Sequence, residues 1–202
     1  MTVFAPIIRL SERILVILQP KMRKMENNDM KWKTLSQRYL IEKPWLTARV
    51  DKVELPTGAV IDEYYVLEYP DWVNTIAITK EGKFVFVRQY RYALGKTVNE
   101  LCAGVIEKGE EPMAAARREL MEETGFGGGN WQEWMTISAN PSTHTNLTHC
   151  FLATNVELLS EQHLDEGEDV QVRIFTRQEV EDMFVHTDNP TVVSCAWGLF
   201  YL

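Results

Sequence analysis

One segment, Gly104–Phe126, constrains this chain more than any other, because it encodes a turn, a helix and a row of carboxylates in close succession. Pro112 suits the first position of a helix, where its missing N–H costs nothing, and Gly125 is a typical residue just after a helix end. Alanine, arginine, leucine and methionine lie between them and favour the helical state. The sequence therefore predicts a helix over 112–124, with Glu111 as its N-terminal cap.

The predicted helix carries a cluster of carboxylates. Glu119, Glu122 and Glu123 fall within about 100° of one another around the helix axis. A solvated acidic face is the simplest interpretation of such a pattern, but Glu107 and Glu110 place more acid directly before the helix. Clustered carboxylates form a hard oxygen site suited to Mg²⁺ or Mn²⁺, ions that bridge phosphate oxygens and activate water. The pattern therefore favours a metal site for phosphate chemistry.

The segment matches every fixed position of the Nudix box, G-x5-E-x7-R-E-U-x-E-E-x-G-U, where U is a bulky apolar residue. The matching residues are Gly104, Glu110, Arg118, Glu119, Leu120, Glu122, Glu123, Gly125 and Phe126. A chance match is on the order of 10⁻⁹ per start position, given ordinary residue frequencies. The chain thus resembles the Nudix hydrolases, which cleave nucleoside diphosphates linked to another moiety. The resemblance implies an α/β fold, the Nudix α/β/α sandwich with a mixed sheet.

The resemblance also implies roles for individual residues. Glu119, Glu122 and Glu123, together with the backbone carbonyl of Ala103, would be the metal ligands, with Mg²⁺ as the cofactor and Mn²⁺ as a possible substitute. Arg118 would orient the glutamates through ion pairs, and Glu122 and Arg118 are both expected to take part in catalysis.

Charge and cysteine content limit the partners. The formal net charge of −8 and the pI of about 5.1 argue against a nucleic-acid partner, which requires a basic face. The apolar run Ile14–Leu18 is far too short to span a bilayer, so no membrane association is expected. Cys102, Cys150 and Cys195 are odd in number and lack a C-x-x-C spacing, which predicts buried free thiols and a cytoplasmic protein.

The chain divides into three parts. Residues 1–30 are irregular in pattern and are predicted to be a poorly ordered extension. Residues 31–72 are predicted to form an N-terminal antiparallel strand extension that builds a homodimer, with strands at 45–55 and 63–69 joined by a Pro-Thr-Gly turn. Residues 73–202 are predicted to be the Nudix hydrolase domain.

Within that domain, alternation and turn signals predict further elements. Strands are expected at 73–79, 83–90, 97–104, 131–138, 148–154 and 170–175. A capping box at Thr176–Glu179 predicts a helix to about Val185, and Asn189 followed by Pro190 predicts a last helix to the C-terminus. The run Gly127–Gly129 lacks a following Lys-Ser or Lys-Thr, so it is interpreted as a flexible connector rather than a phosphate loop.

Outside the box, the chain resembles the Nudix branch that hydrolyses ADP-ribose. An Arg-Gln-Tyr-Arg run ends at Arg91, which would contact the diphosphate through its guanidinium, and Glu100 matches an acidic substrate-binding position. Pro141 lies 15 residues beyond Phe126, as does a proline typical of this branch. Trp45 matches an aromatic residue that stacks on adenine, and a core or interface anchor is an equally weighted alternative.

A loop carboxylate is the expected general base. Glu166 corresponds best to the Glu that deprotonates water in this branch, with Glu168 as the alternative, although a solvated acidic turn is the simpler interpretation. The chain departs from the branch where Ser142 replaces a Gly and Asn146 stands where an acid is frequent. The leading hypothesis is Mg²⁺-dependent hydrolysis of ADP-ribose to AMP and ribose 5-phosphate. The alternatives are the same chemistry on another nucleoside diphosphate sugar, and a ligand-sensing Nudix domain without catalysis.

Overall fold

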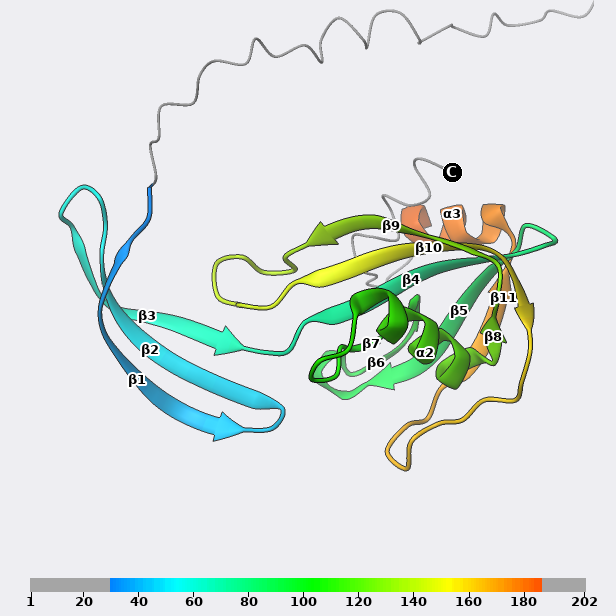
Figure 1. Cartoon of the computed structure of the whole chain (residues 1–202), viewed down its shortest axis with the longest axis horizontal. Coiled ribbons are helices and arrows are strands. Elements are labelled where there is room, and N and C mark those ends of the chain that lie inside the picture. The colour runs from blue at the N-terminus through cyan, green and yellow to red at the C-terminus, as the bar shows by residue number, and fades with distance from the viewer. Residues whose placement is uncertain (1–29, 187–202) are drawn as a thin grey trace, which may run out of the picture.

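The computed structural model describes residues 30–186. The expectations for the extension over 1–29, for Cys195 and for the helix beyond Pro190 lie outside these residues. Figure 1 shows the described part as a curved N-terminal sheet beside a larger body of strands and helices. Among the described residues, no helix is long and apolar enough to cross a membrane.

The N-terminal sheet contains β1 (Lys33–Lys43), β2 (Leu46–Glu54) and β3 (Val60–Glu68), paired antiparallel in that order. The predicted hairpin is confirmed by the pairing of β2 with β3. Strand β1 was not predicted from the sequence, because its apolar and polar residues do not alternate cleanly. All of its residues are exposed in this chain, so no buried face imposes a period of two on its sequence.

The larger sheet is mixed, as the family resemblance implied. Its strands are β4 (Trp72–Thr79), β5 (Phe84–Arg91), β6 (Lys96–Glu100), β7 (Cys102–Val105), β8 (Phe126–Gly127), β9 (Asn130–Ile137), β10 (Thr148–Leu158) and β11 (Gln171–Phe175). The central order is β11-β5-β4-β10-β8, with β4 and β10 parallel. The strand predicted over 97–104 is divided at Leu101, and its halves pair with different neighbours, β6 with β5 and β7 with β4.

Helices α2 (Pro112–Thr124) and α3 (Arg177–His186) cover opposite faces of this sheet, which confirms the α/β/α sandwich (Figure 1). The side chains of β5 alternate between the two faces, as a period of two requires. Val85 packs in the cluster that contains Leu120 of α2. Phe86 packs instead with Val180 of α3. Both faces of β5 are therefore buried over its first half, Phe84–Val87.

Helix α2 has the predicted bounds. Gly125 follows it in the left-handed conformation, with φ of 73°, and donates its N–H to the carbonyl of Met121. Glu111 occupies the N-cap position but makes no side-chain capping hydrogen bond, so that part of the prediction is wrong. The Glu111 carbonyl still accepts the first helical bond, from the N–H of Ala115 at 3.0 Å. The capping box of α3 is confirmed, since Thr176 N–H donates to Glu179 at 2.7 Å.

The glycine run after α2 is a tight turn and not a flexible connector, which corrects the prediction. Phe126 and Gly127 pair with β10 as a short strand, and Gly128 and Gly129 have φ values of 68° and 67°. A Cβ on Gly129 would stand 2.2 Å from the carbonyl oxygen of Thr154. Glycine is required there because the turn lies directly against the β10 backbone. Elsewhere, Cys102 and Cys150 are buried free thiols, as predicted.

Candidate active site

Arg118 is the centre of a carboxylate cluster on α2. Its guanidinium binds Glu110 through two parallel hydrogen bonds of 2.9 Å. It also donates to Glu119 at 2.9 Å, to Glu122 at 3.0 Å and to the carbonyl of Val105 at 3.1 Å. The planar, permanently charged fork of arginine suits such simultaneous contacts. The hydrogen bonds from Arg118 hold the pKa of Glu110 below its usual value.

Glu123 lies beneath this cluster and is only 5 % exposed. Its carboxylate accepts a hydrogen bond of 3.2 Å from the N–H of Ala103 on β7. Burial raises the pKa of Glu123 to about 7, and the charges of Glu119 and Glu168 act in the same direction. Hydrogen bonds from Cys102 and from the Ala103 N–H oppose this rise. Glu123 is therefore a carboxylate whose charged form is costly until positive charge compensates it.

Gly104 allows Glu119 to approach the end of β7. A Cβ on Gly104 would stand 1.9 Å from the carboxyl carbon of Glu119, so any side chain there would displace the carboxylate. Burial raises the pKa of Glu119, and the charges of Glu122 and Glu168 add to this effect, while the hydrogen bond from Arg118 lowers it. The box glycine thus lies within β7, where it pairs with Val73 and leaves room for the Glu119 carboxylate, and the sharp turn predicted for this segment does not fall at Gly104.

The donor set fits a divalent cation in its chemistry. Several oxygen ligands from one helix, with no imidazole among them, suit Mg²⁺ or Mn²⁺. Burial first, and neighbouring carboxylates second, raise the pKa values of Glu119 and Glu123, and a cation bound beside them would favour their charged forms. Within residues 30–186, however, no three acidic, histidine or cysteine side chains already converge on a single point as a metal shell.

The loop over 159–170 is tied to the C-terminal end of α2. Gln162 donates to the carbonyl of Glu123 at 2.6 Å, and the N–H of His163 donates to the carbonyl of Glu122 at 2.9 Å. These contacts bring the acidic part of the loop towards the cluster. Glu168 is close enough for its charge to raise the pKa of both Glu119 and Glu123.

Glu166 and Glu168 are both exposed in this loop, yet they differ in their relation to the cluster. The carboxylate of Glu168 accepts the N–H of Asp165 at 3.1 Å, which closes a turn. Only Glu168 of the two contributes to the shifted pKa values on α2. The charge of Glu168 therefore acts on Glu119 and Glu123, whereas the family resemblance favours Glu166 as the base.

A cavity of about 530 Å³ opens beside the cluster, and Ala103 lines it. Arg91 and Glu100, predicted separately as substrate contacts, form one side of this pocket and bind each other. The Arg91 Nη2 atom lies 2.6 Å from Glu100, and its Nε donates to the same carboxylate at 3.0 Å. Gln89 adds a weaker hydrogen bond of 3.3 Å to Glu100. The structure brings the two residues to one pocket, and their mutual pairing was not predicted from the sequence.

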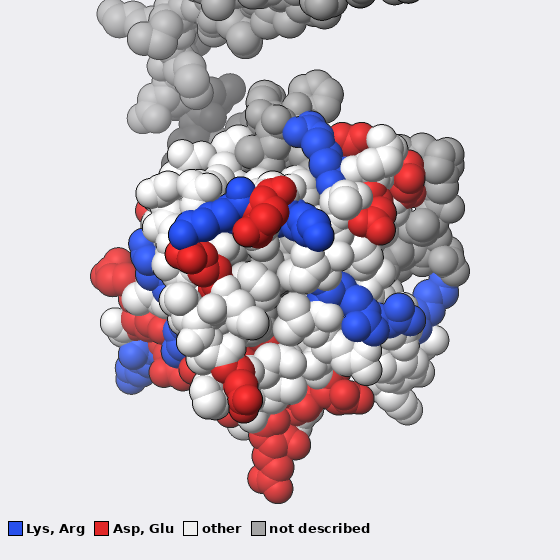
Figure 2. All heavy atoms as spheres, turned by 90° about the vertical axis from the view of Figure 1, so that its right-hand side faces the viewer, with Lys and Arg blue, Asp and Glu red and all other residues white. Residues whose placement is uncertain are grey.

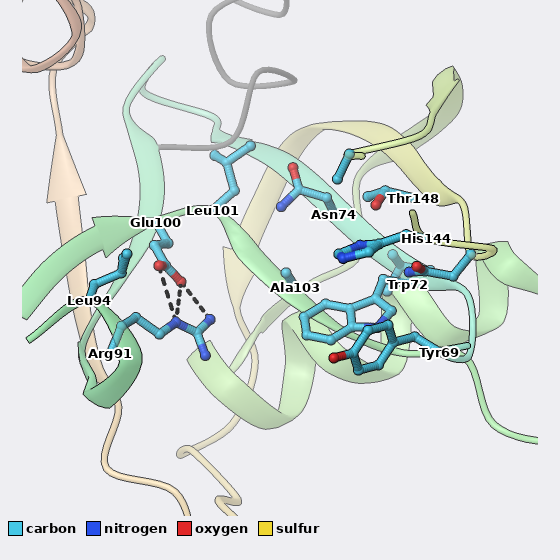
Figure 3. A pocket seen from close by; sticks show the side chains of 13 residues that line it. Tyr69, Trp72, Asn74, Arg91, Leu94, Glu100, Leu101, Ala103, His144 and Thr148 are labelled. Atoms are coloured by element: carbon cyan, nitrogen blue, oxygen red, sulfur yellow. Dashed lines mark hydrogen bonds and ion pairs between the residues drawn. The ribbon is translucent and has the colours of Figure 1, made fainter. Parts of the chain in front are cut away.

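The opposite side of the pocket is aromatic and was not predicted. Figure 3 shows Tyr69, Trp72 and His144 grouped across the pocket from the Arg91–Glu100 pair, with Ala103 between the two sides. Tyr69 and Trp72 lie on either side of Pro70 and Asp71, between the strand predicted over 63–69 and the strand predicted over 73–79. The sequence signal for this aromatic wall was the presence of two aromatic residues directly before a predicted strand.

Two predicted substrate residues lie away from this pocket in the described chain. Trp45 stands in the turn between β1 and β2 and is 75 % exposed, and it does not line the pocket. Pro141 is exposed in the loop between β9 and β10, where Ala139, His144 and Asn146 are the residues that line the pocket. Pro141 therefore belongs to a loop that reaches the pocket, but it does not line the cavity itself.

The surface of the molecule mixes the two signs of charge. On the face in Figure 2, lysine and arginine side chains stand in separate groups between acidic ones, and they form no single basic patch on that face. This arrangement accords with the net charge of −8.

Comparison with known families identifies two consecutive matches. The model described as "NUDIX domain" matches residues 69–194. The model described as "Nucleoside diphosphate sugar hydrolase N-terminal domain" matches residues 32–67, which contain β1, β2 and most of β3. The boundary between these two matches falls at the connection between the two sheets.

Individual proteins match over most of the chain. A protein of Bacillus subtilis named "ADP-ribose pyrophosphatase" is 34% identical over 148 residues, which are 73% of this chain and 80% of that protein. A protein of Bacillus methanolicus named "Methanol dehydrogenase activator" is also 34% identical over 148 residues, with the same coverage. A solved structure titled "Crystal structure of ADP compounds hydrolase" superposes with a TM-score of 0.73 at 21% identity, covering 84% of this chain and 91% of that one.

Proposed function

This chain belongs to the Nudix hydrolase family, and on that premise we propose that it hydrolyses the diphosphate linkage of ADP-ribose to AMP and ribose 5-phosphate. One observation carries the proposal. Ala103 joins the carboxylate cluster, through its N–H to Glu123, to the pocket that holds Arg91 and Glu100. A diphosphate could therefore lie over the cluster while a group attached to it enters the pocket. The name of the Bacillus subtilis relative supports ADP-ribose as the substrate.

Mg²⁺, with Mn²⁺ as a substitute, is the proposed cofactor. Glu119, Glu122, Glu123 and the carbonyl of Ala103 would hold it. When bound, such an ion neutralises phosphate charge and lowers the pKa of a water molecule. Arg118 positions Glu119 and Glu122 and keeps Glu110 folded against the start of α2, so that these carboxylates face one region.

A carboxylate of the 159–170 loop would accept the proton of the attacking water. Water adds to one phosphorus, the bond from that phosphorus to the bridging oxygen breaks, and the bridging oxygen leaves on the other phosphate. The electrostatic reach of Glu168 to Glu119 and Glu123 supports Glu168 as this base, and Glu166 is the alternative in the same loop. The box glutamates are poorer candidates, because cations would already compensate their charge.

Arg91 and Glu100 are the proposed substrate contacts on the polar side of the pocket. A guanidinium can bind a diphosphate with two parallel hydrogen bonds. Glu100 holds the Arg91 side chain in place, and it can accept a hydrogen bond from a substrate hydroxyl. Pro141 contributes by shaping the loop that leads to the pocket.

We further propose that residues 31–72 form the interface of a homodimer and that residues 73–202 form the hydrolase domain. Strand β1 exposes Leu35, Tyr39 and Ile41, and Trp45 is exposed in the following turn. Such apolar exposure is typical of a surface that a partner covers. In this arrangement, Trp45 of the partner subunit would stack on the adenine. A cytoplasmic location is consistent with the buried free thiols.

A hydrolysis assay with purified full-length protein and Mg²⁺ tests the proposed function. The substrates would be ADP-ribose, UDP-glucose, GDP-mannose, NADH and dinucleoside polyphosphates, with products separated by chromatography. AMP and ribose 5-phosphate from ADP-ribose, with the highest kcat/KM of the panel, is the expected result. Equal or faster hydrolysis of another nucleoside diphosphate sugar would favour the alternative substrate class.

Two alternatives remain distinguishable by the same assay. Asn146 lines the pocket where an acid is frequent in the ADP-ribose branch, and this departure favours a different sugar as the second candidate. A non-catalytic sensor would bind a ligand without turning it over. The complete box, with Glu110, Glu119 and Glu122 bonded to Arg118 and Glu123 bonded to the N–H of Ala103, argues against that possibility.

The dimer is tested by sedimentation of the full chain and of a chain that begins at Val73. The full chain is expected to sediment as a dimer, and the shortened chain as a monomer or as an insoluble product. A soluble and fully active monomer of the shortened chain would contradict the proposed interface.

A further inference from the structure

The aromatic side of the pocket is built partly by the N-terminal sheet of the same chain. Leu67 of β3 donates its N–H to the carbonyl of Thr143 at 2.8 Å, and its carbonyl accepts the N–H of Thr145 at 3.1 Å. These two bonds form a parallel bridge between Leu67 and His144. Tyr64 adds a hydrogen bond from its hydroxyl to the carbonyl of Ser142. The loop after β9 is thus fixed to β3 on both sides of His144.

This attachment determines where the His144 ring lies. The ring centroids of Tyr69 and His144 are 5.4 Å apart, with the planes tilted by 59°. In Figure 3 both rings stand with Trp72 on the side of the pocket away from Arg91. The backbone bridge and the ring contact are independent restraints on one side chain, so the aromatic wall is preorganised.

The two sides of the pocket differ in charge. Arg91 and Glu100 are its only lining side chains with a permanent charge among the described residues, and they pair with each other. The aromatic side is accompanied by neutral polar groups, which are Asn74, Asn146 and Thr148. Rings with amide and hydroxyl groups around them suit an uncharged ligand that has apolar faces and many hydroxyls. A sugar ring has this combination, whereas a second nucleobase has few hydroxyls to offer.

We propose that Tyr69 and His144 are specificity-determining residues that receive the uncharged sugar half of the substrate. The inference rests on the proposed hydrolysis of a nucleoside diphosphate sugar. It assigns the Arg91 side to the diphosphate and the aromatic side to the sugar. The N-terminal sheet then sets substrate selectivity within its own chain, through Leu67, independently of any dimer that it forms.

The test compares substrates that share ADP and differ only in the group attached to it. The kcat/KM values for ADP-ribose, ADP-glucose and diadenosine diphosphate would be measured for the wild type, His144→Ala, His144→Gln and Tyr69→Ala. The wild type is expected to prefer its better sugar substrate over diadenosine diphosphate by about tenfold or more. The variants are expected to change the ratio between the two sugar substrates by about fivefold or more.

Thr145→Ala is the matched control. Thr145 lies beside His144 in the same loop, but it is exposed and does not line the pocket, and alanine retains the N–H that bonds Leu67. Its substrate ratios are expected to stay within about twofold of the wild type. Equal losses on all three substrates in the His144 and Tyr69 variants, with unchanged ratios, would show a merely structural role and overturn the inference.

Failure of the proposed function has a different signature. If the wild type hydrolyses none of the three compounds, the proposed function is wrong. The role of Tyr69 and His144 is then tested by measuring how tightly each variant binds these compounds. Quenching of tryptophan fluorescence, which can report on Trp72 in the pocket, would be titrated with each compound in the presence of EDTA. Weaker binding of ADP-ribose by His144→Ala than by Thr145→Ala supports the aromatic wall, and equal binding by both overturns it.

Discussion

The carboxylate cluster and the pocket meet at Ala103, but they are assembled in opposite ways. Most of the cluster comes from the single helix α2, and its members are joined by charged hydrogen bonds to Arg118. The pocket draws on β4, β5, β6, β7, β10, the connection from β3 and the loop after β9, and its aromatic side holds no Asp, Glu, Lys or Arg among its lining residues. The cluster concentrates charge suited to chemistry, whereas the pocket supplies shape suited to selection. Substitutions in the two regions should therefore affect rate and selectivity separately.

The largest effect is expected for Glu123→Gln, which removes a charge from the base of the cluster. Even residues that only support metal ligands are worth about 10–100-fold, so loss of a direct ligand should lower kcat by about 100-fold or more. Glutamine keeps the shape of a side chain that is 5 % exposed, so the fold should persist. Turnover and thermal midpoint would be measured on one preparation. Turnover within about threefold of wild type, roughly 0.7 kcal/mol of barrier, would contradict the role.

The next effect is expected for the loop base. Glu168→Gln should lower the single-turnover rate at saturating Mg²⁺ by about 100-fold and leave substrate affinity nearly unchanged, because removal of a general base costs about 10²–10⁴ in rate. Glu166→Gln is the control in the same loop and should fall by less than about tenfold. A larger loss for Glu166→Gln would restore the assignment made from sequence. If neither variant loses tenfold, the loop is an acidic turn alone.

A smaller effect is expected for Arg118→Lys. Lysine keeps the positive charge but cannot make parallel hydrogen bonds to Glu110 while also reaching Glu119 and Glu122. The loss of orientation should lower kcat by about tenfold and the thermal midpoint by a few degrees, since about 1 kcal/mol shifts the midpoint of such a domain by that much. Arg117→Lys, on the same helix, offers a control. Equal activity of both variants would show that the fork geometry is unimportant.

Stability without metal should depend on pH through Glu123. Its folded pKa is raised from an ordinary 4.5 to about 7, so the folded state retains a proton that the unfolded state has lost. The contribution of Glu123 to the free energy of unfolding should therefore be largest below about pH 4.5. It should fall as the pH rises from there, and it should level off above about pH 7. Denaturant unfolding in EDTA would show the loss, on the order of 3 kcal/mol at most. Glu123→Gln should remove it, and an unchanged slope in that variant would contradict the assignment.

The smallest rate effect is expected on the pocket side. Arg91→Lys should raise KM about five- to tenfold with kcat nearly unchanged, because it loses contacts made equally in the ground and transition states. Arg88→Lys is the control, since Arg88 is exposed on the same strand and does not line the pocket. A fall in kcat with unchanged KM would show that Arg91 acts in the chemical step. The proposed separation between a catalytic cluster and a binding pocket would then be wrong.

The sequence was informative where local rules govern structure. Helix α2 has the predicted bounds because Pro112 and Gly125 act on their own neighbours. Strand β5 lies where alternation and turn signals predicted a strand over 83–90. Strand β1 escaped prediction because neither of its faces is buried in this chain. The run Gly127–Gly129 was misinterpreted because its purpose, close approach to β10, depends on a strand distant in sequence.

The sequence alone determined the chemistry, because the spacing of Glu119, Glu122 and Glu123 on one helix fixes their common face, and the box identifies the family. Tertiary structure decided how that chemistry is arranged. It paired Arg91 with Glu100, placed the charge of Glu168 within reach of Glu119 and Glu123, and fixed His144 to β3. Each of these contacts joins strands and loops whose register is set by the packed sheets and by backbone hydrogen bonds between distant segments. Periodicity cannot encode such pairings, since they depend on where other parts of the chain come to lie.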